Sequence, residues 1–190
     1  MNDAGLSDET LIARYARGDA GAFTALYRRH ELRIWRYLER NMGSRATAEE
    51  LMQEVWFAVA RDAERYRPTA RFTTWLFTIA RNRMVDAVRA RRAHLSLDAV
   101  AHESETVLER LTADPGAGPL AAAEARDRAA ALRLALAQLP PEQRDALLLQ
   151  LEGDLSVGEV ATITRASFET VKSRLRYART RLRELLSEYA

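Results

Sequence analysis

The chain has 190 residues, which suits one domain or two small ones, and 47% of them are hydrophobic, enough to build a core. It has no cysteine, which excludes disulfides and thiolate metal sites, and its few glycines and prolines favour helical structure. The net charge of +2 is unevenly spread, since residues 1–92 carry 17 arginines against 12 acidic residues, residues 93–137 carry 4 against 7, and residues 138–190 balance 8 basic with 8 acidic residues.

The N-terminal residues show no recognisable targeting signal. "MNDAGLSDET" lacks a basic-then-apolar pattern, and no apolar run approaches membrane-spanning length. We therefore expect a cytoplasmic protein that has no contact with a membrane. Residues 7–41 are predicted to form two helices, the first capped by Ser7 and the two separated by Gly18 and Asp19.

A third helix is predicted from about residue 47, because Thr47 and Glu50 have the spacing of a capping box. Its apolar residues recur on one face. A second face gathers four polar side chains, Glu49, Glu50, Gln53 and Glu54. Taken alone, this polar face is typical of a helix that is simply solvated.

The segment "RFTTWLFTIARNR", residues 71–83, mixes aromatic residues with arginines at the start of a helix predicted over about 71–92. Unstacked bases need aromatic faces and the DNA backbone needs positive charge, so the pattern fits single-stranded nucleic acid. An amphipathic helix with buried aromatic rings and solvated arginines would give the same pattern. Both interpretations stay open for each aromatic residue.

The remainder of the chain predicts a linker and a second helical unit. Residues 93–119 are acidic, lack a sustained period and contain the breaker "DPGAGP", which indicates a flexible linker. After a helix over 120–138, a short helix, the turn "RAS" and a long final helix have a helix-turn-helix layout. The predicted fold is therefore all-α, with two small helical domains at 1–92 and 120–190, the second carrying the helix-turn-helix.

Four sequence blocks, in this order, carry a resemblance to a known family. They are "LIARYARGDAGAFTALYRRH" (11–30), "AEELMQEVWFAVAR" (48–61), "RFTTWLFTIARNRMVDAVRARR" (71–92), and "LPPEQRDALLLQLEGDLSVGEVA" with "TVKSRLRYARTRLRELL" near the end. Together they resemble bacterial RNA polymerase sigma factors of the sigma-70 family, extracytoplasmic-function (group 4) subfamily. These blocks cover nearly the whole chain apart from the predicted linker.

The resemblance implies partners and roles. Core RNA polymerase would be bound through the clamp helices of its largest subunit and its flap region, promoter DNA would be the second partner, and many members of the family also bind an anti-sigma factor. The four polar residues on the third helix correspond to the clamp-docking surface. Six residues are implied in recognition and melting of the −10 element: Tyr66, Arg71, Thr74, Trp75, Arg81 and Asn82.

Within that set, Tyr66 corresponds to a residue that lines the pocket for a flipped-out base, and Asn82 to one that reads a base edge. Trp75 either contacts DNA or braces the loop from inside. The resemblance also implies that the final helix and its turn read the −35 element. The −35 candidates are Arg165, Glu169, Thr170, Lys172, Ser173 and Arg176.

The chain departs from the family at the turn, where Thr164 and Arg165 replace the usual Leu-Gly pair, so the turn must avoid a positive φ or accept strain. Two other functions were considered. A stand-alone helix-turn-helix regulator would leave residues 45–92 without a role. An enzyme is disfavoured, because the three histidines lack metal-ligand spacing and there is no nucleophile or phosphate-loop motif, so we expect no metal and no cofactor.

Overall fold

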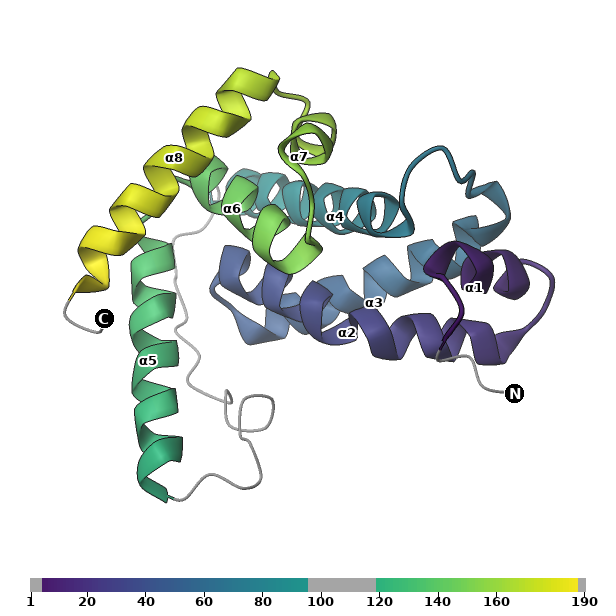
Figure 1. Cartoon of the computed structure of the whole chain (residues 1–190), viewed down its shortest axis with the longest axis horizontal. Coiled ribbons are helices and arrows are strands. Elements are labelled where there is room, and N and C mark those ends of the chain that lie inside the picture. The colour runs from purple at the N-terminus through teal and green to yellow at the C-terminus, as the bar shows by residue number, and fades with distance from the viewer. Residues whose placement is uncertain (1–4, 96–118, 188–190) are drawn as a thin grey trace.

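The computed structural model describes residues 5–95 and 119–187, and this part of the chain is helical with no strand. The N-terminal lobe contains α1 (Asp8–Tyr15), α2 (Ala20–Met42), α3 (Arg45–Asp62), a short 3₁₀ turn (Ala63–Arg65) and α4 (Phe72–Leu95). The C-terminal lobe contains α5 (Pro119–Ala137), α6 (Pro141–Gly153), α7 (Val157–Thr164) and α8 (Phe168–Leu185) (Figure 1). The predicted all-α fold with two helical lobes is confirmed. The predicted linker, 93–119, lies almost entirely outside the described residues.

Side-chain caps place the helices of the N-terminal lobe. Ser7 caps α1 by accepting from the Thr10 amide at 3.2 Å, and Asp19 caps α2 by accepting from the Ala22 amide at 3.2 Å. The predicted capping box of Thr47 and Glu50 is wrong. The helix begins two residues earlier, at Arg45, because Ser44 is its cap and Gly43 (φ 66°) ends the preceding helix in the left-handed conformation.

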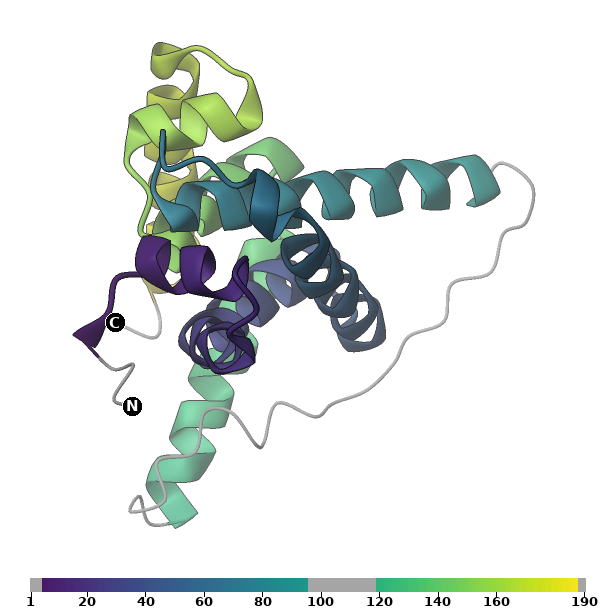
Figure 2. The same cartoon turned by 90° about the vertical axis from the view of Figure 1, so that its right-hand side faces the viewer.

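The first turn of α4 is held by another helix. The backbone amide of Phe72 donates to the Glu9 carboxylate of α1 at 2.9 Å. This bond fixes the end of the loop that connects the 3₁₀ turn with α4. At its other end α4 runs to Leu95, three residues beyond the predicted boundary, and extends past the body of the molecule (Figure 2).

The helix-turn-helix forms as predicted from α7 and α8. Ser156 and Glu159 make a capping box on α7, and Ser167 caps α8. Arg165 occupies the turn with φ 53°, so the turn keeps the left-handed conformation without a glycine. Six residues were expected to pack: Val160, Ala161, Ile163, Val171, Leu175 and Ala178. All of them are buried except Ala161, which is half-buried.

The two lobes are packed directly against one another. Helices α6 and α7 lie beside α2 and α4. Helix α5 packs its C-terminal end against α2 and α8, while its N-terminal end projects away from the other helices (Figures 1 and 2). One cluster of buried side chains runs through both lobes, with Tyr37 and Phe77 from the first and Leu148 and Leu155 from the second. The contact between lobes is thus part of the hydrophobic core rather than a few surface pairs.

Candidate polymerase-docking and DNA-binding surfaces

The first candidate surface lies on α3. Its four predicted docking residues, Glu49, Glu50, Gln53 and Glu54, are all exposed, as the helical spacing indicated. Glu49 forms an ion pair with Arg45 at 2.7 Å one turn earlier, while the other three carry no ion pair in the described ranges. The surface can therefore present net negative charge to a partner.

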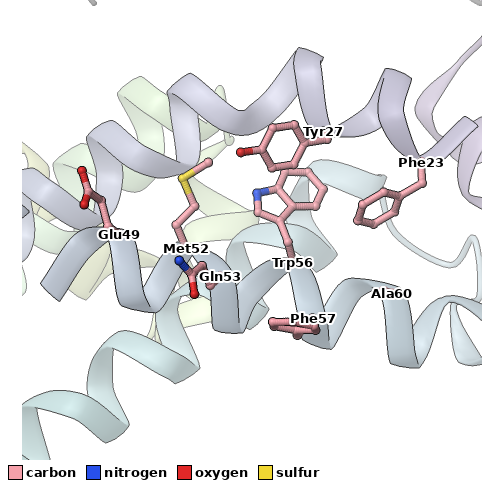
Figure 3. Close-up of a pocket in the computed structure, with 8 residues that line it drawn as sticks. All are labelled: Phe23, Tyr27, Glu49, Met52, Gln53, Trp56, Phe57 and Ala60. Carbon is pink, nitrogen blue, oxygen red and sulfur yellow. The ribbon is translucent and has the colours of Figure 1, made fainter. Parts of the chain in front are cut away.

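Beside these carboxylates the structure reveals an apolar hollow between α2 and α3 (Figure 3). The rings of Tyr27 and Trp56 contact one another in its lining, with centroids 5.0 Å apart and planes tilted by 53°. Phe57 lies at its edge with 75% of its surface exposed. The hollow is lined by Phe23, Tyr27, Glu49, Met52, Gln53, Trp56, Phe57 and Ala60. The sequence analysis missed Phe57, although a phenylalanine on an otherwise polar helix face was a usable signal.

The second candidate surface comprises the loop before α4 and the first turns of that helix. Tyr66 is half-buried, donates its hydroxyl to the Ala70 carbonyl at 3.0 Å, and packs its ring against Trp75 at 5.1 Å. Trp75 also contacts the Phe72 ring, with centroids 5.8 Å apart, so it connects the loop residue Tyr66 with the first turn of α4. Asn82 is exposed two turns further along.

The other three residues predicted for this surface contact the C-terminal lobe. Arg81 donates to Asp145 at 2.7 Å and to the Ile163 carbonyl at 3.4 Å. Thr74 is 6% exposed and donates to Glu159 at 2.6 Å. Arg71 donates to the Asp154 carbonyl at 3.2 Å and lies 3.9 Å from Glu159. The structure therefore brings Arg71, Thr74 and Arg81 together, but against protein.

The acidic groups at this contact are well paired. Burial would raise the pKa of the Glu159 carboxyl, but hydrogen bonds from Thr74 and Ser156 and the charge of Arg71 hold that pKa below its usual value. Burial and the neighbouring Asp145 carboxylate raise the pKa of the Tyr37 hydroxyl well above its usual value, so Tyr37 stays neutral and donates to Asp145 at 2.7 Å. The Glu159 and Asp145 carboxyl groups at this contact thus each accept from more than one donor.

The third candidate surface lies on the turn before α8 and along that helix. All six predicted residues are exposed there: Arg165, Glu169, Thr170, Lys172, Ser173 and Arg176. Four of them line a shallow groove together with Arg179, Thr180 and Arg183. Local pairs hold some of these side chains, since Lys172 lies 3.9 Å from Glu169 and the Arg176 guanidinium sits 4.9 Å from the Tyr177 ring centre. This face is basic and open, as a reader of duplex DNA requires.

Three further observations bear on other functions. Within residues 5–95 and 119–187, no group of three or more His, Cys, Asp or Glu side chains could hold a metal ion. His30 is buried and lies 2.7 Å from the Asp8 carboxylate. Among the helices in those two ranges, none is both long enough and apolar enough to cross a membrane.

Comparison with known proteins matches both lobes. The family described as Sigma-70 region 2 matches residues 26–94, and Sigma-70, region 4 matches residues 129–182. The RNA polymerase sigma factor CarQ of Myxococcus xanthus is 33% identical over 93% of this chain and 96% of its own length. The ECF RNA polymerase sigma factor RpoE of Cereibacter sphaeroides is 32% identical over 89% of this chain and 88% of its own length.

Solved structures give the same result. The sigma factor RpoE in complex with the anti-sigma factor NepR from Bartonella quintana superposes with a TM-score of 0.71 at 26% identity, over 87% of this chain and 96% of that one. CnrH in complex with the cytosolic domain of CnrY superposes with a TM-score of 0.65 over 96% and 99% of the two chains, and its 24% identity supports the fold alone.

Proposed function

We propose that this chain, which belongs to the ECF RNA polymerase sigma factors and is therefore a transcription initiation factor, binds core polymerase through α3, reads the −35 element with α8, and reads and melts the −10 element with α4 and its preceding loop. The observation that carries the proposal is the 33% identity to CarQ over 93% of the chain, which includes all three surfaces. The exposed, basic face of the helix-turn-helix supports it independently.

The docking role of α3 rests on charge and on apolar area. Glu50, Gln53 and Glu54 are exposed and would meet basic residues on the polymerase clamp helices, a complementary contact that favours association. Phe57 and the hollow beside it offer an apolar anchor next to those charges. An anti-sigma factor bound to these charges and the hollow would exclude the polymerase from the same surface. By similarity to the NepR-bound relative, we include such a factor among the proposed partners.

The −35 role follows from the position of side chains on α8. Glu169 and Thr170 lie in its first turn, where a recognition helix contacts base edges. Lys172 and Arg176 lie one turn apart on the exposed groove, within reach of bases or phosphates. Arg165 precedes the helix in the turn and would contact the DNA backbone.

The −10 role assigns a flipped base to Tyr66 and a base edge to Asn82. Tyr66 offers a half-buried ring at a hollow formed with Glu9, Ala63 and Pro68, and the ring is fixed from behind by Trp75. The exposed Asn82 amide can donate and accept at once, as reading a base edge requires. Extruding a base costs a few kcal/mol, which stacking and hydrogen bonding in such a pocket would offset.

Run-off transcription tests the proposal. Purified chain is combined with core polymerase on genomic fragments, and transcript start sites are mapped. We expect discrete starts that appear only when the chain is present and that share sequences near −10 and −35. Specific binding of duplex DNA by the chain alone, with no start sites in the presence of core polymerase, would instead identify a stand-alone helix-turn-helix regulator.

A further inference from the structure

The first turn of α8 carries an exposed aromatic side chain that none of the three candidate surfaces includes. Phe168 is the first residue of that helix and has 53% of its surface exposed, whereas Val171, Leu175 and Ala178 of the same helix are buried. Single exposed apolar residues are common on protein surfaces, so the place of Phe168 on the helix, rather than its exposure alone, indicates its role.

Phe168 lies at the border between the buried face of α8 and its basic groove. Successive residues of an α-helix are about 100° apart, so Lys172 lies about 40° from Phe168 on one side and Val171 about 60° away on the other. Lys172 lines the groove and Val171 is buried. Because Cα–Cβ bonds tilt towards the N-terminus of a helix, the Phe168 side chain extends over the leading end of α8. That end is the part of a recognition helix that contacts base edges.

The polar groups at this end are engaged in capping the helix. Ser167 accepts from the Thr170 amide at 3.1 Å, and the hydroxyl groups of the two residues lie 2.8 Å apart. The other two side chains of the first turn are those of Phe168 and Glu169, and the Glu169 side chain is 77% exposed. These two side chains are therefore the ones at the leading end of α8 that take no part in its cap.

Neither of these side chains suits the DNA backbone. Phosphates repel the Glu169 carboxylate and offer nothing to an apolar ring, whereas the arginines and Lys172 of the groove can contact phosphates as well as bases. On a base edge in the major groove, a carboxylate accepts from the amino group of cytosine, and an apolar side chain contacts the C5-methyl group of thymine. The chemistry of Phe168 thus fits a single feature of duplex DNA.

We propose that Phe168 is a specificity-determining residue of the −35 interface and contacts the C5-methyl group of one thymine in the major groove. This inference rests on the proposed −35 role of α8. It adds an apolar contact to a surface whose other candidate residues are polar or charged. The contact favours a T·A pair over a C·G pair at one position of the −35 element, because cytosine has no methyl group there.

The test removes the methyl group from the DNA and the ring from the protein in separate steps. Start-site mapping gives the −35 element, and each thymidine in either strand is replaced in turn by deoxyuridine, which lacks only the C5-methyl group. Competition binding measures the affinity of the complete holoenzyme for each promoter fragment. With the wild-type chain, one replacement should lower the affinity about fourfold, as expected for one methyl group returned to water.

The same promoters are then tested with variants of the chain. Phe168→Ala holoenzyme should bind the thymidine and deoxyuridine forms equally well, because the protein partner of the methyl group has been removed. Each variant is compared with itself on two DNAs, so a change in the fraction of active protein cancels. Tyr177→Ala is the matched control, since Tyr177 is an aromatic residue of the same helix with 55% of its surface exposed, and it should keep the fourfold difference. Phe168→Gln replaces Phe168→Ala if circular dichroism shows that the latter does not fold.

Three results would overturn the inference. A −35 element with no thymine in either strand, or a wild-type holoenzyme that is insensitive to every deoxyuridine, would mean that no methyl group is recognised. A fourfold difference that persists in Phe168→Ala would mean that another side chain contacts the methyl group. A failure of the proposed function is recognised separately, because the run-off assay would then yield no start sites, and the inference would fall with it.

Discussion

Helices α4 and α8 are the two proposed DNA-reading elements of this chain, and they present their basic side chains very differently. On α8 the charged residues pair locally, for example Lys172 with Glu169 and Arg181 with Glu184 three residues on, and the face stays open. At the start of α4, Arg81 pairs with the Asp145 carboxylate 64 residues away, and Arg71, which directly precedes the helix, lies beside the Asp154 carboxylate 83 residues away, so this part of the face is partly covered. Further along the helix, Arg89 pairs locally with Asp86. Residues of the same type thus differ in availability because of what lies opposite them.

The zero net charge of residues 138–190 also conceals two faces of opposite charge. The basic residues of this segment are concentrated on α8, while Asp145, Glu152, Asp154 and Glu159 lie on or beside α6 and α7 facing the N-terminal lobe. The lobe is therefore electrically two-sided, basic towards solvent and acidic towards α2 and α4. A count of charges along the chain conceals this separation.

Reversal of charge on α3 should abolish the proposed promoter recognition by α4 and α8 together, and it is the largest effect we expect. Glu50→Lys with Glu54→Lys would place positive charge against the basic clamp helices, so co-purification with core polymerase should fall more than tenfold, by roughly 1.4 kcal/mol or more. Both residues are exposed, so the thermal midpoint of unfolding should barely move. Full co-purification by a folded double variant would remove α3 from the docking surface.

Substitutions at the proposed −10 surface should impair promoter opening and leave −35 binding by α8 unchanged. Tyr66→Ala should cost about 1–3 kcal/mol in promoter opening if its ring stacks on an extruded base. Asn82→Ala should cost a similar amount, concentrated at one base pair. The measurement is open-complex formation by each holoenzyme on promoters with all four bases at each −10 position. Equal loss on every promoter would show that Asn82 supports the fold rather than reading a base.

Substitutions on α8 should weaken −35 binding and leave melting of the −10 element unchanged. Lys172→Ala or Arg176→Ala should weaken binding of a duplex −35 fragment by about 1–3 kcal/mol if the side chain reads a base. If it contacts a phosphate, the loss should be uniform across sequences and the salt dependence should decrease by about one charge. Titration of holoenzyme against −35 variants at several salt concentrations distinguishes these roles. Neither variant should alter melting of a fragment that contains only the −10 element.

In the turn before α8, Arg165 combines a strained backbone conformation with a basic side chain. Arg165→Gly removes both, and its effects on stability and on DNA binding can be measured separately. Glycine adopts the left-handed conformation at φ 53° without a Cβ penalty, so the C-terminal lobe should gain up to about 1 kcal/mol of stability. Thermal unfolding measures the gain. If Arg165 contacts a phosphate, affinity for duplex DNA should decrease in the same variant. A variant that is both more stable and equally tight in DNA binding would exclude that contact.

Acid should loosen the contact between the lobes, with the smallest effect of the five. The pKa of the Glu159 carboxyl lies below its usual value of 4.5 in the folded chain, so its ionised form stabilises the folded state above about pH 4.5, and this stabilisation is lost as the pH falls through the folded pKa. Glu159→Gln keeps the side-chain cap of α7 but lacks the charge towards Arg71. The thermal midpoint of unfolding of this variant should therefore fall less between pH 5 and 3.5 than that of the wild type. Identical pH profiles would exclude Glu159 as the titrating group.

Much of this structure was predictable because it depends on neighbours in the sequence. Helical spacing correctly placed Glu50, Gln53 and Glu54 on an exposed face, and the segment before α8 was correctly assigned to a turn. The error at the start of α3 is of the same local kind, since Ser44, three residues before Thr47, is itself a good cap and the helix begins directly after it. Phe57 was not predicted, although its place on the polar face of the helix indicated exposure; the hollow beside it, formed with α2, could not be predicted from α3 alone.

The sequence by itself therefore determined the helices, the two lobes, the family and the residue types on each candidate surface, since capping, periodicity and motif order are properties of short stretches. Only the tertiary structure decided that Thr74 is buried against Glu159 and that Arg81 shares Asp145 with Tyr37. These partners are 64 to 108 residues apart, and a helical repeat specifies which side chains share a face without specifying what that face will meet. Availability of the −10 surface is thus a property of how the two lobes pack.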